Sequence, residues 1–413
     1  MLPKKRTAAL LAAAAAVMAV TGCSVDKAPQ DNGSEVISLT IWGPEESQDM
    51  LREMTEAFTE YYKDEAAVEV FIGVEAEDTL ADNIKANPQN AADVFQFADD
   101  QMTTLLDNNV LLPITENAEE IIAANGGKDS PAVQCASRWG KLYACPLTAS
   151  NGYFLFYNAD YFSESDVETL DGILDAAERS GKYFSMDWSS GWYIYSFFGG
   201  AGFELYTAED GSKNFCNWNE TAGKYSGVQV ARAMLDISAR GCFLNAGNDE
   251  FVKRVQEGSV IAGVNGPWNA EKLKAAWGDA YRAAKLPTYT LAGEQVQMYS
   301  FMGYKLVGVN AYTENPLWAT RLAEWISNCE NQLKRFDYTG ECPCNVEAAG
   351  EERVLSSQVA KALSAQRPFS IREDVAYPYW SPSSAFGTIM ASGNPDGADL
   401  QMLLDDLVEQ AQS

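Results

Sequence analysis

The chain has 413 residues, of which 46% are hydrophobic, and its formal net charge is −28. Such acidity argues against nucleic acid or an anionic lipid surface as a partner. The chain contains no histidine, which excludes Ser-His-Asp and Cys-His catalysis and the common histidine-rich zinc sites. No phosphate-binding or dinucleotide-binding glycine motif occurs, so we expect neither a cofactor nor a bound metal.

The N-terminus predicts a secretion signal. Residues 4–6 are basic, residues 8–20 form an apolar run, and Val20-Thr21-Gly22-Cys23 ends the segment. This pattern resembles a bacterial lipoprotein signal, and the apolar run is too short to span a bilayer. We therefore expect removal of residues 1–22 and lipidation of Cys23. Residues 23–35 would then tether the protein to the extracellular face of the cell membrane. The alternative is an ordinary secretory signal with a chance cysteine.

Periodicity predicts a βαβ unit at the start of the mature chain, because apolar residues alternate in short runs on either side of an amphipathic segment. The expected elements are strands over 38–42, 68–72 and 93–97 and helices over 45–62 and 80–87. Strands joined by such helices are parallel, and their carboxyl ends meet at a ligand crevice. Glu45, Glu46, Phe97 and Asp100 follow or end these strands, which makes them candidate ligand contacts.

A hairpin is predicted at Trp139-Gly140-Lys141, with Cys135 and Cys145 on either side of it. These two cysteines could pair across the hairpin, although export permits disulfides without requiring them. The close pair Cys342 and Cys344 is a weak metal or redox signal because no second pair completes a site.

Two β runs flank the small polar residues 148–152. Strands interrupted in this way favour a crossing from one domain to another, with the small residues as a hinge. A simple β-meander is the alternative.

Residues 183–202 are unusually aromatic. A helix is predicted from Tyr193 to Phe198, with Trp192 and Tyr195 near its start, and most rings at helical spacing should be core residues.

The short apolar run after Gly258 predicts a buried strand, broken by Asn265-Gly266-Pro267 and followed by a helix from about Asn269. Trp268 stands directly after the break, where an indole lines a crevice rather than filling a core. The alternative is a core tryptophan that closes the turn.

The remaining chain alternates predicted strands and helices. Helices are expected over 226–241, 316–331, 383–391 and 398–412, and strands at 286–289 and 304–310. A stiff aromatic loop contains Trp380.

Several stretches, taken in order, resemble the extracellular solute-binding proteins of ABC importers, of the maltose/maltodextrin-binding type. They are Ala92-Asp93-Val94-Phe95-Gln96-Phe97-Ala98-Asp99-Asp100, Gly140-Lys141-Leu142-Tyr143-Ala144-Cys145-Pro146, Tyr157-Asn158, Glu257-Gly258-Ser259-Val260, Asn265-Gly266-Pro267-Trp268 and Leu286-Pro287-Thr288. The set covers most of residues 36–412. Phe97 stands where such proteins usually carry tryptophan, Gln101 where they carry arginine, and Ser150 or Asn151 where they carry an acidic residue.

The resemblance implies an α/β, two-lobed type II periplasmic-binding-protein fold, with hinge-crossing strands and a central ligand cleft. Residues 36–148 and 303–350 would form the N-terminal lobe, and residues 149–302 and 351–413 the C-terminal lobe. The ligand-binding residues it implies are Glu45, Glu46, Phe97, Asp100, Ser150, Asn151, Trp192, Tyr195, Trp268, Trp380, Ser383 and Phe386.

The implied function is extracellular capture of an oligosaccharide, specifically a malto-oligosaccharide, and its delivery to ABC transporter permease subunits by a monomer that performs no chemistry. One alternative is a solute-binding protein for another sugar or a peptide. The other is a surface glycoside hydrolase, which also combines exposed aromatic rings with two carboxylates.

Overall fold

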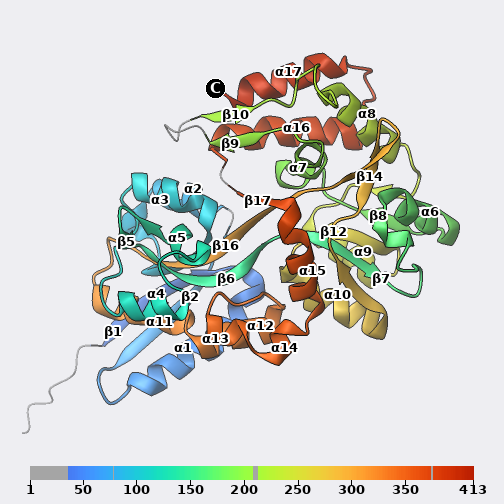
Figure 1. Ribbon diagram of the computed structural model, residues 1–413. Coiled ribbons are helices and arrows are strands. Elements are labelled where there is room, and N and C mark those ends of the chain that lie inside the picture. Colours follow the sequence, from blue (N-terminus) through green and yellow to red (C-terminus); the bar gives the residue numbers. More distant parts are fainter. Residues whose placement is uncertain (1–35, 78, 208–212, 374) are drawn as a thin grey trace, which may run out of the picture. The chain divides into compact units, whose positions relative to one another are not determined.

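The computed structural model describes residues 36–77, 79–207, 213–373 and 375–413 (Figure 1). Residues 1–35, which include the predicted signal, Cys23 and the tether, lie outside the described residues. In the described part of the chain, no helix is both long and apolar enough to cross a membrane. The described chain is a mixed α/β structure with two main sheets.

The first sheet has the order β17-β16-β3-β1-β2, and β6 also pairs with β16. β1 is parallel to β2 and β3, as the βαβ pattern predicts, whereas β16 runs antiparallel to β3 and β6. Its strands are β1 (Ile37–Gly43), β2 (Val68–Val74), β3 (Val94–Ala98), β6 (Ala144–Gly152), β16 (Ser300–Val309) and β17 (Ser370–Arg372).

Helices of the first region connect these strands or follow β16 in the chain. They are η1 (Glu45–Ser47), α1 (Gln48–Tyr62), α2 (Leu80–Lys85), α3 (Met102–Asp107), α4 (Ala118–Ala124), α5 (Pro131–Cys135), α11 (Pro316–Ile326), α12 (Cys329–Thr339), α13 (Val346–Ala349) and α14 (Glu352–Leu355). α1 is amphipathic, and its residues Met50, Met54 and Phe58 are completely buried. This apolar stripe holds the helix on the core of the first region.

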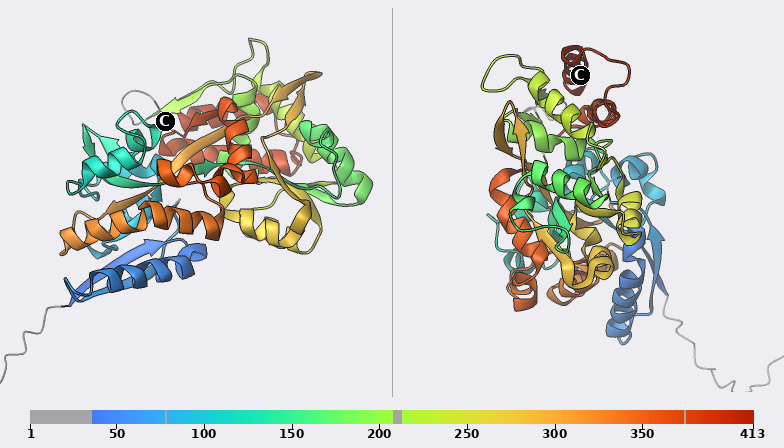
Figure 2. Two further views of the ribbon diagram at one scale, coloured as in Figure 1. Left: turned by 60° about the horizontal axis from the view of Figure 1, so that its bottom comes forward. Right: turned by 90° about the vertical axis from the view of Figure 1, so that its right-hand side faces the viewer.

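The second sheet has the order β11-β8-β12-β7-β13. Its strands are β7 (Phe154–Asn158), β8 (Tyr183–Ser185), β11 (Phe243–Leu244), β12 (Val260–Asn265) and β13 (Tyr281–Ala284). Helices of this region are α6 (Leu170–Ser180), α7 (Gly191–Gly200), α8 (Gly227–Ser238), α9 (Asn248–Gln256), α10 (Ala270–Trp277), α15 (Gln358–Gln366), α16 (Trp380–Ala391) and α17 (Leu400–Ala411). α16 and α17 lie beside α8 in every view (Figure 1, Figure 2).

Three short hairpins complete the described strands: β4 (Ser137–Arg138) with β5 (Lys141–Leu142), β9 (Leu205–Thr207) with β10 (Asn214–Cys216), and β14 (Thr288–Leu291) with β15 (Glu294–Gln297). The first confirms the hairpin predicted at Trp139-Gly140. Both turn residues have positive φ, 50° and 74°, as a two-residue hairpin turn that follows the strand twist requires.

The predicted hinge residues, 148–152, lie inside β6 (Ala144–Gly152) rather than between two strands. β6 pairs with β16 in the first sheet, and the chain continues after Tyr153 as β7, which pairs with β12 and β13 in the second sheet. The prediction that these β runs pass from one region to the other is therefore confirmed, and the meander alternative is wrong.

Cys135 and Cys145, which could have paired across the hairpin, are not bonded, and all seven described cysteines are free thiols. Cys135 ends α5 and Cys145 lies on β6, and both side chains are buried. Burial raises the pKa of the Cys145 thiol to about 12, so this group remains protonated and unreactive at neutral pH.

Candidate functional site

A cavity of about 680 Å³ receives side chains from both sheet regions. This volume is in the range of small-molecule sites. Its walls include the residues that follow the carboxyl ends of β1, β3 and β12, the positions where an open α/β sheet binds ligands. The lining residues are Pro44, Glu45, Glu46, Val74, Ala76, Glu77, Ala98, Asp100, Asn151, Asp187, Ser190, Trp192, Tyr193, Asn248, Asn265, Trp268, Lys305, Glu373 and Trp380.

The structure brings seven of the predicted site residues to this cavity: Glu45, Glu46, Asp100, Asn151, Trp192, Trp268 and Trp380. Glu45 and Glu46 begin η1, Asp100 lies in the turn after β3, and Asn151 lies near the end of β6. Trp188, the other tryptophan of the aromatic segment, is completely buried in the second core.

Phe97 and Tyr195 do not line the cavity and are corrected to core residues. β3 lies between β1 and β16 and is buried along its whole length, so the Phe97 ring packs in the first core beside Phe95. Tyr195 points inward from α7 and stacks on Phe301 with ring centroids 4.3 Å apart.

Ser150, Ser383 and Phe386 are also outside the cavity. The Ser150 hydroxyl accepts a hydrogen bond from the Cys342 amide at 3.1 Å. Ser383 is buried within α16 and donates to the Tyr379 carbonyl at 2.7 Å. Phe386 contacts Phe198 in the second core. These three side chains are corrected to structural roles, because helix and strand faces that point away from the crevice are covered by neighbouring elements.

The aromatic wall consists of Trp192, Tyr193, Trp268 and Trp380, all from the second region. Trp192 and Tyr193 are in the first turn of α7, and Trp380 is the first residue of α16. The Trp192 and Trp268 rings lie 5.8 Å apart between centroids with an interplanar angle of 32°. Trp192 donates its Nε1 hydrogen to Glu373 Oε2 at 2.9 Å. Indole faces fixed in this way can cover the C–H faces of a ligand.

Trp268 is held by its own turn and by a neighbouring helix. Its Nε1 donates to Asn248 Oδ1 at 3.0 Å. A Cβ on Gly266 would lie only 2.0 Å from the indole, so the ring occupies space that any other residue at this position would fill. Glycine at 266 therefore permits the observed ring position.

The polar wall consists of Glu45, Glu46, Glu77, Asp100 and Lys305, from the first region. Carboxylates on this wall can accept hydrogen bonds from ligand hydroxyl groups. Asp187, from the loop after β8, adds another carboxylate to the cavity. Burial raises the pKa of the Asp187 carboxyl, opposed by the hydrogen bond that it accepts from the Ser189 amide.

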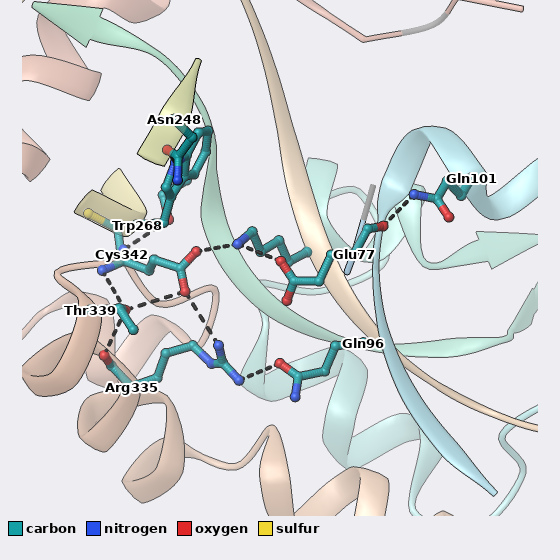
Figure 3. Close-up of polar contacts among 11 residues, drawn as sticks. Glu77, Gln96, Gln101, Asn248, Trp268, Arg335, Thr339 and Cys342 are labelled. Atoms are coloured by element: carbon teal, nitrogen blue, oxygen red, sulfur yellow. Dashed lines mark hydrogen bonds and ion pairs between the residues drawn. The ribbon is translucent and has the colours of Figure 1, made fainter. Parts of the chain in front are cut away.

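Two residues of the polar wall, Glu77 and Lys305, form a buried cluster with Arg335 and Glu341 that we call the ion quartet (Figure 3). Lys305 Nζ lies 2.6 Å from Glu77 Oε2 and 2.6 Å from Glu341 Oε1. Arg335 Nη1 lies 3.4 Å from Glu341 Oε2, and Nη2 donates to Gln96 Oε1. With two cations and two anions, the quartet has no net formal charge, which makes its burial possible.

The pKa values of the two carboxyls of the quartet are shifted in opposite directions. Burial raises the pKa of Glu77, and the attraction of Lys305 only partly opposes it. Burial acts on Glu341 as well, but the combined attraction of Lys305 and Arg335 lowers its pKa. Glu341 is therefore the better stabilised anion because it contacts both cations.

Glu77, Lys305 and the rest of the quartet were not predicted from the sequence. Its members come from the loop after β2, from β16, from α12 and from the loop after α12, and no local motif joins these positions. Gln101 was noted only as a departure from arginine. In the structure it donates to the Glu77 carbonyl and accepts from the Ala81 amide at 2.8 Å, which supports the Glu77 loop.

The described residues contain no group of three or more Asp, Glu or Cys side chains placed to hold a metal ion. The cavity combines hydrogen-bonding carboxylates and amides with flat apolar faces. This arrangement suits a neutral ligand that has many hydroxyl groups and apolar C–H faces.

A family model described as bacterial extracellular solute-binding protein matches residues 53–362. The chain is 24% identical over 425 residues to a galactooligosaccharide-binding protein of Bacillus subtilis, covering 98% of this chain and 96% of that one. It is also 24% identical over 417 residues to a maltooligosaccharide ABC transporter solute-binding lipoprotein of Streptococcus pneumoniae, covering 95% and 93%.

Solved structures of other proteins share the fold. One, solved with acarbose, has a TM-score of 0.79 and 26% identity, covering 92% of this chain and 99% of that one. The Thermus thermophilus maltotriose-binding protein, bound with maltotriose, has a TM-score of 0.74 and 18% identity, covering 90% and 98%. The two-lobed α/β fold expected from the sequence is thereby confirmed, and the chain belongs to the family of bacterial extracellular solute-binding proteins.

Proposed function

We propose that this protein captures an oligosaccharide, specifically a malto-oligosaccharide, outside the cell and delivers it to an ABC transporter. The observation that carries the proposal is the meeting of the aromatic wall with the polar wall in one cavity of about 680 Å³. Indole rings stack on sugar C–H faces, while Glu45, Glu46 and Asp100 accept hydrogen bonds from hydroxyl groups. The names of relatives that bind maltooligosaccharides support the same ligand class.

Galactooligosaccharides are the second candidate ligand, because the equally similar Bacillus relative is named for them. The two sugars present hydroxyl groups at different positions. A carboxylate that is left without its hydroxyl partner loses hydrogen-bond energy, so the polar wall would discriminate between them.

Binding without bond cleavage is part of the proposal. The predicted lobes, 36–148 with 303–350 and 149–302 with 351–413, would close on the sugar by bending of β6 and β16. A ligand shifts such an equilibrium by its preference for the closed state. The closed form would then present the sugar to permease subunits.

For its location, we propose a monomer anchored at the extracellular face of the membrane by lipid on Cys23, with residues 23–35 as the tether. Nucleic acid and further membrane contacts have no part in this arrangement, since the chain is strongly acidic.

The proposal is tested by isothermal titration calorimetry on the chain without residues 1–22 and with Cys23→Ala. The panel is glucose, maltose, maltotriose, longer maltodextrins, galactooligosaccharides, xylo-oligosaccharides and a peptide pool. We expect one-to-one binding confined to the maltodextrins. Binding of galactooligosaccharides alone would replace the malto-oligosaccharide as the proposed ligand. Binding of the peptide pool alone would overturn the proposal of a sugar ligand.

The hydrolase alternative is tested by incubation with maltoheptaose followed by chromatography. We expect the sugar to be recovered intact. Shorter products that persist through repeated purification would contradict a binding-only role.

A further inference from the structure

The ammonium of Lys305 has partners on several sides. Two are the carboxylates of Glu77 and Glu341, each 2.6 Å away. The third is the indole of Trp268, whose ring centroid lies 5.5 Å from Lys305 Nζ. The Lys305 side chain is only 8% exposed, so this cation–π contact is largely desolvated and therefore stronger than a contact at the surface.

These partners come from different parts of the fold. Lys305 is on β16 of the first sheet, whereas Trp268 is in η5 (Pro267–Asn269), directly after β12 of the second sheet. Glu341 follows α12 and is 2% exposed. Lys305 therefore joins the aromatic wall to the buried ions beneath the polar wall.

Two features of its own region hold the Trp268 ring, but neither connects the ring to the first region, where Lys305 lies. Asn248 fixes the indole nitrogen, and the bare backbone at Gly266 permits the ring to lie over it. Both contacts belong to the second region. The contact with Lys305 links the ring to the first region.

We propose that Lys305 is a positioning residue of the ligand site. Its ammonium holds the Trp268 ring in the orientation used for stacking, and Glu77 and Glu341 hold the ammonium. This inference rests on the proposed function for its effect on sugar affinity, but the ring position itself can be measured without sugar.

A purely structural role for Lys305 predicts a different result. In that case loss of the cation would weaken folding, and the folded protein would keep its Trp268 orientation. The two roles are separated by a readout at Trp268 and by the dependence of the affinity on the indole.

The test removes the Lys305 cation while keeping the net charge of the quartet at zero. Lys305→Met/Glu77→Gln removes one positive and one negative charge and leaves the Arg335–Glu341 pair. Glu77→Gln alone is the reference for every comparison, because it keeps the cation and already contains any effect of losing Glu77. If the Met variant does not fold, Lys305→Gln/Glu77→Gln replaces it, since glutamine can donate to Glu341 without a charge.

The first readout is 19F NMR of protein labelled with fluorotryptophan, with the Trp268 resonance assigned by Trp268→Phe. We expect this resonance to broaden in the variant without the cation relative to Glu77→Gln, because a ring that is no longer held samples several orientations. A resonance that stays sharp in a folded variant would overturn the proposal, whether or not any sugar binds. A shift without broadening counts as this outcome, because loss of the charge alters the shielding of a fixed ring directly.

The second readout is sugar affinity in a double-mutant cycle built on Glu77→Gln. Loss of the Lys305 cation should weaken binding roughly 2- to 30-fold when Trp268 is present, the range from an exposed to a desolvated cation–π contact. In Trp268→Ala protein the same change should have almost no effect. Equal losses in both backgrounds would overturn a role through Trp268. Absence of binding by the unmodified protein would instead refute the proposed function, and the NMR result would still decide the position of the ring.

Discussion

The two walls of the cavity are built in different ways. The polar wall places short carboxylate side chains in turns that follow strands of the first sheet, whereas the aromatic wall places three tryptophans at or just before the starts of helices in the second region. Stacking tolerates many sugars because C–H faces are common to them, but hydrogen bonds to carboxylates depend on the position of each hydroxyl. We infer that the aromatic wall supplies affinity and the polar wall supplies selectivity.

The walls also differ in what lies behind them. The aromatic wall is backed by an apolar core that includes Tyr153, to which Trp192 is adjacent at 4.6 Å between ring centroids. The polar wall shares Glu77 and Lys305 with the ion quartet, whose other members, Arg335 and Glu341, lie behind it. Loss of one contact in an apolar core lowers the stability of the fold only in part, whereas a buried charge without its counter-charge lowers it strongly. The following experiments perturb each wall separately.

The largest effect is expected behind the polar wall. Arg335→Met leaves Glu341 with Lys305 as its only cation and removes the donor to Gln96, and Arg335 is 1% exposed. We expect the free energy of unfolding to fall by about 3 to 5 kcal/mol, the cost of breaking a buried ion pair. Urea denaturation followed by circular dichroism measures it.

Arg353→Met is the matched control, because Arg353 pairs with Asp337 at the surface, where both side chains are about half exposed. Surface ion pairs contribute little, so its stability should hardly change. Equal losses for the two variants would show that burial of the quartet does not matter.

The aromatic wall should be broken by Trp268→Ala. We expect sugar binding to weaken by roughly 1 to 3 kcal/mol through loss of a stacking ring, measured by calorimetry with the best ligand of the panel. Trp139→Ala serves as the control, because Trp139 is 76% exposed at the β4–β5 turn and does not line the cavity. Unchanged affinity in a folded Trp268→Ala protein would remove this residue from the site.

A subtler change tests the position of the ring rather than its presence. Gly266→Ala would place a Cβ 2.0 Å from the indole of Trp268, so the ring must move. We expect affinity to fall towards, but not below, that of Trp268→Ala, with the indole still present. Gly241→Ala is the control because its added Cβ meets no atom within 4 Å. Full affinity in Gly266→Ala would mean that the ring position is unimportant.

The smallest effect is expected for Asp187→Asn. Burial raises the pKa of this carboxyl, so the folded state binds its proton more tightly than the unfolded state does. Its contribution to stability is therefore present below the ordinary pKa of 3.8 and is lost as pH rises through the folded value. Asparagine cannot ionise, so the variant should be slightly more stable than the parent at pH 7.

This gain should shrink as pH falls through the raised pKa of the folded state and should be absent below the ordinary value of 3.8, which thermal unfolding at several pH values measures. Asp64→Asn, at an exposed carboxylate, is the control and should show no comparable trend. A gain that persists at low pH would point to a cause other than the charge.

Much of the scaffold followed from local sequence. The βαβ start, the β6-to-β7 crossing and the turn that presents Trp268 were predicted because hydrophobic period and glycine or proline breaks act over a few residues. Residues placed in such breaks, including Glu45, Asp100 and Trp268, reached the cavity.

Tertiary structure decided which side of each element meets the cavity and which distant residues meet one another. Phe97 and Tyr195 became core residues because neighbouring strands and helices cover their faces, and a single element does not encode its neighbours. The quartet joins Glu77, Lys305 and Glu341 across long stretches of chain. Its buried charges are tolerated because folding brings opposite charges together, and no local sequence pattern predicts these contacts.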